Sequence, residues 1–258
     1  NDGIRYLEIR YSPILHINRG MKMAESVENV KLGLKRAEED FGIQCGIIIC
    51  GIRHISPEIS LKLANIAVQF KNNGVVGFDL AGAEENFPAK HHQEAFELIL
   101  KNNINTTLHA GEAYGPDSIH QAIHSCGAHR IGHGTRLKEN SDLMKYVNDH
   151  RIPLEICLNS NIHTKSILSL DKHPFPEYFK KHLRVTLNTD NRLISNTTLT
   201  DEYLTAIKYY KLNPHDIRTI IINGFKSAFL PHLERRVLIK KILDELENKF
   251  GFDKRVIV

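Results

Sequence analysis

Short apolar runs alternate with longer amphipathic segments along the chain. The runs rich in Val, Ile and Leu predict strands at residues 6–10, 45–50, 75–79, 105–108, 129–132, 154–158 and 184–188. Most of these runs are almost continuously apolar, which is typical of strands that are buried on both faces of a sheet.

The segments between these runs carry apolar residues at helical spacing, most clearly at 56–74, 115–127, 140–150, 213–229 and 231–250. In the first of them, Ser56 suits a helix cap, Pro57 the first turn and Gly74 the position just after the end.

Regular alternation of strands and helices predicts an α/β fold with a parallel sheet, either open and doubly wound or closed into a TIM-type (β/α)8 barrel. The glycine fingerprints of nucleotide-binding loops are absent, which favours the barrel. We find no linker, low-complexity tract or shift in composition, so we expect residues 1–258 to form a single barrel domain.

Composition excludes several kinds of partner. The 34 Lys and Arg nearly balance the 30 Asp and Glu and form no basic cluster, so we expect no nucleic-acid partner. The most apolar run, residues 45–52, is too short to cross a bilayer, so we expect no membrane association. The cysteines Cys45, Cys50, Cys126 and Cys157 form no C-x-x-C pair and are interpreted as small buried residues of a reducing compartment. The sequence therefore predicts a cytoplasmic protein.

Reactive side chains follow several of the predicted strands. Asp79, His109 and His133 come at strand ends, Asp190 follows the last strand, and Glu112 lies three residues after His109. In a barrel the carboxyl ends of all strands meet on one face. One such residue would usually be structural, but the combination suggests metal-assisted hydrolysis.

The residue types fit that chemistry. His109 and Asp190 are suitable ligands for a divalent metal such as zinc. A bound metal lowers the pKa of its water, so a hydroxide nucleophile is available near neutral pH. His133 could hold or deprotonate that water, and Glu112 could deliver a proton to the substrate.

Twelve other histidines are interpreted as surface or packing residues. They are His16, His54, His91, His92, His120, His124, His150, His163, His173, His182, His215 and His232.

Several motifs together resemble the adenosine deaminases of the zinc amidohydrolase barrels. Their order and spacing are those of the family, and they span nearly the whole chain. They are LEIRYSP at 7–13, DLAG at 79–82, HAGE at 109–112, GHG at 132–134, SN at 160–161, NTD at 188–190 and SAFLP at 227–231.

The resemblance implies a role for each matching residue. His109 and Asp190 would bind one zinc ion. Glu112 would contact the purine N1 and donate a proton, while His133, together with Asp190, would orient and deprotonate the attacking water. Gly82 would offer its backbone N–H to the purine N3. The implied substrate is a small-molecule purine nucleoside: adenosine, and with it deoxyadenosine, would be converted to inosine and ammonia. Gly111 would let the substrate approach the backbone closely.

One departure from the family pattern affects the contact with the purine N7. Many relatives have a second aspartate after the ligand, whereas this chain has Asn191. An aspartic acid donates to N7 only when it is protonated, while an amide donates at any ordinary pH. We therefore expect Asn191 to keep the contact.

A second departure concerns the metal ligands. The family takes two more zinc ligands from an H-x-H on its first strand, but His16 is the one histidine before His54. Seven strands are predicted instead of eight. We therefore expect the first strand to be missing from these residues. A further N-terminal segment, in the same chain or supplied alongside it, would carry the H-x-H and close the barrel.

Two alternatives remain open at this point. One is a sister deaminase that acts on adenine or on another adenine-containing metabolite, because the residues that contact the ring would be shared. The other is a metal-free, inactive barrel fragment that serves as a binding module. Deaminases built on a P-C-x-x-C zinc motif are excluded, because the chain has no such motif.

Overall fold

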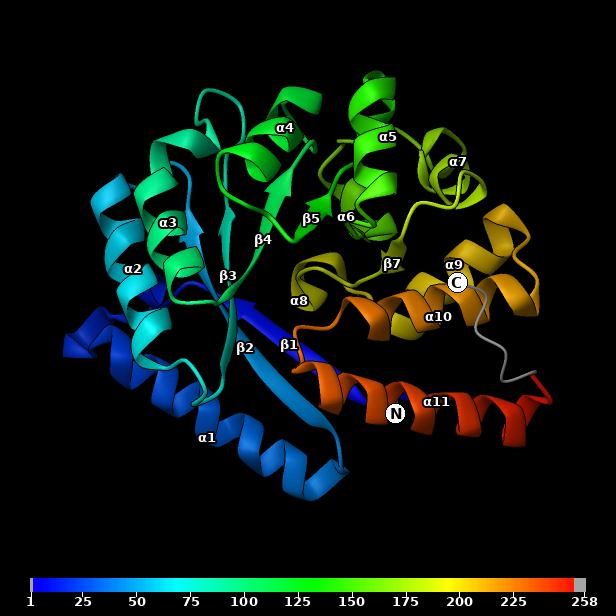
Figure 1. The fold of residues 1–258 in the computed structure, drawn as a ribbon, viewed down its shortest axis with the longest axis horizontal. Coiled ribbons are helices and arrows are strands. Elements are labelled where there is room, and N and C mark those ends of the chain that lie inside the picture. Colours follow the sequence, from blue (N-terminus) through cyan, green and yellow to red (C-terminus); the bar gives the residue numbers. More distant parts are fainter. Residues whose placement is uncertain (1, 253–258) are drawn as a thin grey trace.

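The computed structural model describes residues 2–252 and contains one parallel sheet whose seven strands follow one another in sequence order (Figure 1). All seven predicted strands are present. Each predicted strand differs from the observed one by one or two residues at an end, and the sixth was too long because Leu158 belongs to the helix that follows it. The strands are β1 (Tyr6–Tyr11), β2 (Gln44–Ile52), β3 (Val75–Ala81), β4 (Asn105–Ala110), β5 (Arg130–His133), β6 (Leu154–Ile156) and β7 (Val185–Leu187).

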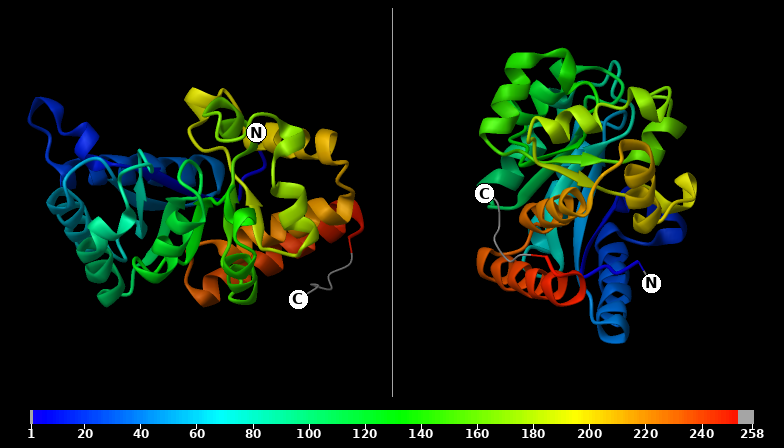
Figure 2. Two further views of the ribbon diagram at one scale, coloured as in Figure 1. Left: turned by 90° about the horizontal axis from the view of Figure 1, so that it is seen from above. Right: turned by 90° about the vertical axis from the view of Figure 1, so that its right-hand side faces the viewer.

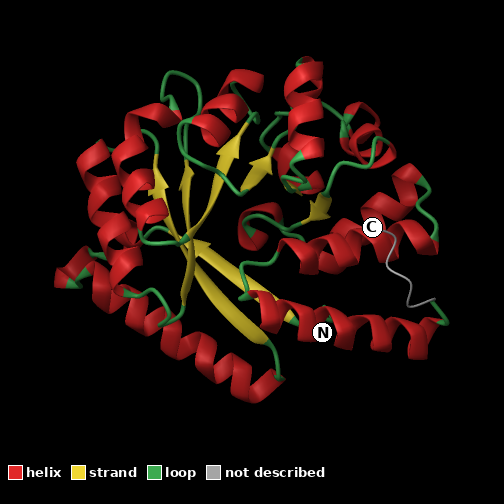
Figure 3. Cartoon of the chain, viewed as in Figure 1, coloured by secondary structure: helices red, strands yellow, loops and turns green. Residues whose placement is uncertain are grey.

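Helices connect the strands and lie outside the sheet (Figure 3). The five predicted helices correspond to α2 (Pro57–Gln69), α4 (Pro116–His124), α5 (Ser141–Asp149), α10 (Pro214–Ser227) and α11 (His232–Phe250). The others are α1 (Met23–Phe41), α3 (Gln93–Lys101), α6 (Leu158–His163), α7 (Phe175–Lys180), α8 (Arg192–Ser195) and α9 (Leu199–Tyr210). Short 3-10 helices lie at Pro13–His16, Asn18–Gly20, Ala89–His92, Leu137–Glu139 and Leu170–Lys172.

The sheet curls strongly, as side-chain contacts across its concave face show. In a flat sheet β1 and β6 would be five strand spacings apart, about 24 Å at about 4.8 Å per spacing. Instead, Nη1 of Arg10 on β1 lies 3.1 Å from Oε2 of Glu155 on β6. Figure 2 shows the same curvature from two further directions. The sheet therefore has the form of a barrel wall.

The hydrophobic core fills the space between the convex face of the sheet and the helices. Ile47, Phe78 and Leu108 of the strands and Leu63 and Phe96 of the helices are fully buried there. A second cluster joins α10 and α11 through Ile222, Leu238, Ile242 and Leu246, and Tyr6 of β1 packs against it. No helix within residues 2–252 is long and apolar enough to span a membrane.

One strand position of the barrel stays open. Within residues 2–252, β1 pairs with β2 and β7 pairs with β6, and no ladder joins β1 to β7. The expected fold class is confirmed as a TIM-type barrel in which seven of the eight strand positions are filled. The carboxyl ends of β3, β4 and β5 lie together at one rim.

Candidate functional site

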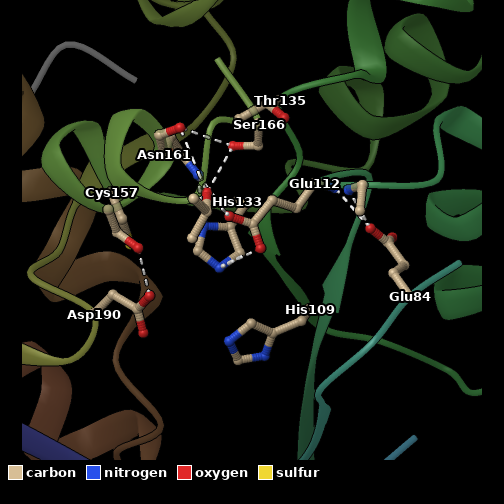
Figure 4. A network of polar contacts seen from close by, with 12 residues as sticks. Glu84, His109, Glu112, His133, Thr135, Cys157, Asn161, Ser166 and Asp190 are labelled. Atoms are coloured by element: carbon tan, nitrogen blue, oxygen red, sulfur yellow. Dashed lines mark hydrogen bonds and ion pairs between the residues drawn. The ribbon is translucent and has the colours of Figure 1, made fainter. Parts of the chain in front are cut away.

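The predicted site residues gather at the carboxyl ends of the strands (Figure 4). His109 is the next-to-last residue of β4, His133 is the last residue of β5, and Asp190 lies in the segment after β7. The ring centroids of His109 and His133 are 5.1 Å apart. The fold thus brings both histidines, Glu112 and Asp190 to one rim.

Two of these residues adopt an unusual backbone conformation. His133 has φ 63° and Asp190 has φ 53°, in the left-handed region that side-chain-bearing residues seldom occupy. Such conformations cost about 1–3 kcal/mol and are found most often at functional sites. The strain supports a functional role for both residues.

Asp79 lies next to His109. Oδ2 of Asp79 lies 3.0 Å from Nδ1 of His109 and 3.3 Å from Nε of Arg10. The imidazole contact is at hydrogen-bond distance but is poorly aligned, so the attraction between the two groups is mainly electrostatic. Burial disfavours the charged form of Asp79, but His109 and Arg10 outweigh it and lower the pKa of this carboxyl. An ionised Asp79 favours a proton on Nδ1 of His109 and leaves Nε2 as a free electron-pair donor.

Asp190 is held in its charged form. Burial raises the pKa of its carboxyl, but nearby His133 and the hydrogen bond from Ser160 lower it further than burial raises it. Ser160 Oγ donates to Oδ2 of Asp190 at 2.7 Å. An ionised carboxylate is what a metal ligand or a proton acceptor requires.

The donor chemistry of this rim suits a divalent metal, but the set is partial. A neutral imidazole with a carboxylate behind it and an ionised carboxylate are typical zinc ligands. Within residues 2–252, however, no group of three or more His, Cys, Asp or Glu side chains is placed to hold a metal. His109 and Asp190 would therefore contribute part of a coordination shell.

Glu112 is fixed by contacts on both carboxylate oxygens. Asn161 Nδ2 donates to Oε1 at 3.2 Å and Thr164 Oγ1 donates to the same atom at 2.9 Å. Oε2 lies 3.6 Å from Nε2 of His133. A cavity of about 450 Å³ lies beside this carboxyl, lined by Glu112, Ala113, Arg136, Thr164, Lys165 and Ser166. A partly exposed carboxyl in fixed orientation can exchange a proton with a bound molecule.

The two predicted substrate contacts lie at the same rim. Gly82 directly follows β3 with φ +95°, and a Cβ there would meet Nδ1 of His54 at 3.1 Å. Asn191 caps α8, since its Oδ1 accepts from the backbone N–H groups of Leu193 and Ile194 at 3.2 and 3.1 Å. With its oxygen engaged, the Asn191 amide can act through its N–H donors. The contacts of Gly82 and Asn191 with a purine ring stay predictions.

Gly111 is required by its backbone conformation and by packing. Its φ is +69°, and a Cβ would clash with Cδ1 of Ile119 on α4. The missing side chain lets the loop after His109 turn over α4, while a close approach of the substrate at Gly111 stays a prediction.

Glu84 is a site residue that the sequence analysis missed. Its buried carboxylate accepts four successive backbone N–H groups of the loop after β4, those of Gly111 (2.5 Å), Glu112 (3.0 Å), Ala113 (2.6 Å) and Tyr114 (3.1 Å). The sequence around it, AEEN at 83–86, is typical of an exposed loop, and no local pattern indicates that Glu84 is buried while Glu85 is exposed.

Arg53 holds the other side of the same loop. This buried side chain donates through Nη2 to the backbone oxygen of His109 at 2.7 Å and through Nη1 to that of Phe87 at 2.9 Å. The charge of Glu84 also acts on Arg53. Two buried, opposite charges therefore fix the backbone that carries His109 and Glu112.

The fold and the site define a TIM-type barrel with histidines and carboxylates at the carboxyl ends of its strands, the arrangement of barrel hydrolases. More specifically, the family model "Adenosine deaminase" matches residues 1–245, so the chain belongs to the adenosine deaminase family, a family of hydrolases.

Curated relatives agree with this assignment. A probable adenosine deaminase of Dictyostelium discoideum is 41% identical over 256 residues, which cover 98% of this chain and 33% of that protein. The adenosine deaminase of Mycobacterium ulcerans is 38% identical over 94% of this chain and 71% of its own length. The chain thus spans about a third of the first relative and about seven-tenths of the second.

Solved structures show the same fold. The adenine deaminase of Arthrobacter aurescens superposes with a TM-score of 0.89 at 24% identity, covering 95% of this chain and 75% of that one. The N6-mAMP deaminase of Arabidopsis superposes with a TM-score of 0.84 at 29% identity, covering 93% and 73%.

Proposed function

We propose that the protein catalyses the zinc-dependent hydrolytic deamination of adenosine to inosine and ammonia, and accepts deoxyadenosine as well. The observation that carries this proposal is the convergence of His109, Glu112, His133 and Asp190 at one barrel rim in a member of the adenosine deaminase family.

Each side chain has a task in the proposed reaction. Glu112 faces the ring and protonates N1, since its carboxyl is held in place and accessible. His133 and Asp190 are the two groups that orient the attacking water and accept its proton. Gly82 and Asn191 contact the ring at N3 and N7.

His109 and Asp190 would hold the zinc ion. Bound there, zinc would supply Lewis-acid activation of water near neutral pH. Asp79 supports His109 in this role, because it keeps the proton on Nδ1 and leaves Nε2 available.

Zinc needs further ligands besides His109 and Asp190, and these must come from another segment. The open position between β1 and β7 is where an eighth parallel strand would pair, and we propose that a strand carrying the family's H-x-H lies there. It would complete both the barrel and the coordination shell.

A second candidate is deamination of adenine or an adenine nucleotide. The Arabidopsis N6-mAMP deaminase has a similar fold at 29% identity, and a related Arabidopsis structure is described as complexed with IMP. The contacts that distinguish these substrates would involve N9, ribose or phosphate, whereas the residues assigned here contact the ring.

The test is a substrate comparison with the full-length, zinc-loaded protein. Adenosine, deoxyadenosine, adenine, AMP and N6-methyl-AMP are compared by kcat/KM, with ammonia release as the readout. Glu112→Gln is the active-site control, and chelation followed by zinc addition tests the metal. Preference for adenosine with recovery on zinc addition supports the proposal. Turnover that chelator leaves unchanged, or preference for another compound, contradicts it.

A further inference from the structure

A chain of hydrogen bonds behind the site determines which nitrogen of His133 carries its proton. The chain begins at His173, which is buried. Its Nδ1 accepts from the backbone N–H of Phe175 at 3.0 Å. A backbone N–H can only donate, so Nδ1 carries no proton. Burial lowers the pKa of His173 to about 3, so its ring is neutral with the proton on Nε2.

His173 in turn fixes the amide of Asn161, which is fully buried. Nε2 of His173 lies 3.2 Å from Oδ1 of Asn161, and because Nε2 donates, the atom that faces it must be the amide oxygen. The amide nitrogen therefore points the other way. There it lies 3.2 Å from Oε1 of Glu112, an acceptor. Both contacts would become unfavourable if the amide were flipped.

The same amide nitrogen reaches His133. Nδ2 of Asn161 donates to Nδ1 of His133 at 3.0 Å, so Nδ1 of His133 is an acceptor and carries no proton. A neutral imidazole has one N–H, which must then be on Nε2. That nitrogen points toward Glu112, with 3.6 Å between Nε2 and Oε2.

We propose that Asn161 and His173 are positioning residues that hold His133 as the Nε2–H tautomer, so that His133 donates a hydrogen bond into the site from Nε2. The inference rests on the proposed function for the reaction itself, while the tautomer rests on the hydrogen bonds alone.

The opposite assignment is inconsistent with the surrounding contacts. To accept a proton on Nε2, the ring of His133 would have to begin with its proton on Nδ1, facing the Asn161 amide. The Asn161 amide would then have to present its oxygen to His133. This flip would turn the amide N–H₂ group toward the N–H of His173 and the amide oxygen toward the carboxylate of Glu112. Two hydrogen bonds would become repulsive contacts.

The experiment is NMR of the full-length, zinc-loaded protein with isotope-labelled histidine. Ring nitrogen chemical shifts distinguish protonated from unprotonated nitrogens. We expect His133 and His173 of the unmodified protein both to show a protonated Nε2 and an unprotonated Nδ1. A protonated Nδ1 in His133 would overturn the proposal, and this result needs no variant and no substrate.

Asn161→Asp tests the cause. A carboxylate only accepts, so we expect Nδ1 of His133 to become protonated and kcat to fall by about 10–100-fold, the range for partners of catalytic groups, with a smaller change in KM. Asn140→Asp is the matched control, because Asn140 caps α5 away from the site and an aspartate keeps that cap. An unchanged His133 tautomer in Asn161→Asp contradicts the proposal. Failure of the unmodified protein to deaminate any purine would refute the proposed function and leave the tautomer result intact.

Discussion

The carboxylate of Glu84 is expected to hold the loop that carries Glu112, and Glu84→Gln is the sharpest test of that role. Oε2 accepts from three backbone N–H groups and Oε1 from that of Gly111. Glutamine has nearly the same shape but one acceptor oxygen and no charge. The retained oxygen can face three of the donors, and the new N–H₂ group then faces the N–H of Gly111.

The size of the effect follows from these contacts. Hydrogen bonds to a charged acceptor contribute about 1.5–3 kcal/mol and neutral ones about 0.5–1.5 kcal/mol, so three weakened bonds cost about 3 kcal/mol. A buried donor without a partner costs a further 1–3 kcal/mol or so. Contacts in one network are not additive, and the loop can relax, so we expect a loss of about 3 kcal/mol in the free energy of unfolding. For a chain of this size that lowers Tm by about 6–12 °C.

Activity should fall together with stability, because Glu112 moves with the loop. Displacement of a catalytic group by about 1 Å can cost about 10²-fold, so we expect kcat to drop by up to that factor with a smaller change in KM. Glu85→Gln is the matched control: Glu85 is adjacent and exposed, and its substitution should change stability by less than about 0.5 kcal/mol. Denaturant unfolding and steady-state kinetics measure both effects. A Glu84→Gln protein as stable and as active as Glu85→Gln would refute this reasoning.

Three further predictions concern the site and the barrel interior. Glu112→Gln should retain metal but lose about 10²–10⁴-fold in turnover, measured by kcat and metal content; near-normal turnover would contradict the assignment. Asn191→Asp should stay active but lose kcat/KM relative to the unmodified protein as pH rises, since the introduced carboxyl ionises and stops donating to N7; identical pH–rate profiles would exclude that contact. Arg130→Met should cost about 3–5 kcal/mol in unfolding free energy, because Glu8 (2.6 Å) and Glu155 (2.7 Å) lose their buried partner; a loss below about 1 kcal/mol in chemical denaturation would count against it.

The strands and the start of α2 could be predicted from sequence because their signals are local. Ser56 and Pro57 lie where the cap position and the first turn were expected. The expected end was wrong, because α2 spans Pro57–Gln69 and Gly74 lies five residues beyond it. The strand predicted at 154–158 was two residues too long, because the apolar residue Leu158 opens α6 instead. Hydrophobicity alone does not distinguish a buried strand end from a buried helix start.

The supports of the site could not be predicted, because they join residues far apart in sequence. Glu84 acts on a loop 27 to 30 residues away, and His173 reaches His133 only through Asn161. His173 was interpreted as a packing residue, which its burial would also suggest. Its hydrogen-bond direction depends on the backbone N–H of Phe175, a contact that no spacing of residue types reveals.

Ion pairs inside the barrel explain how an open sheet can keep the residues of the site in position. Arg10 on β1 bridges Asp79 on β3 and Glu155 on β6, at 3.3 and 3.1 Å. Arg130 on β5 joins the same Glu155 to Glu8 on β1. These contacts cross the interior instead of following the strand ladder, so they fix the distance between β1 and the β5–β6 wall without a hydrogen-bonded strand between β1 and β7. Burial of such charges is costly unless every partner is present. The curl that brings β1 against β5 and β6 is therefore coupled to an ionic network, and loss of one arginine should disturb the rim as well as the stability of the fold.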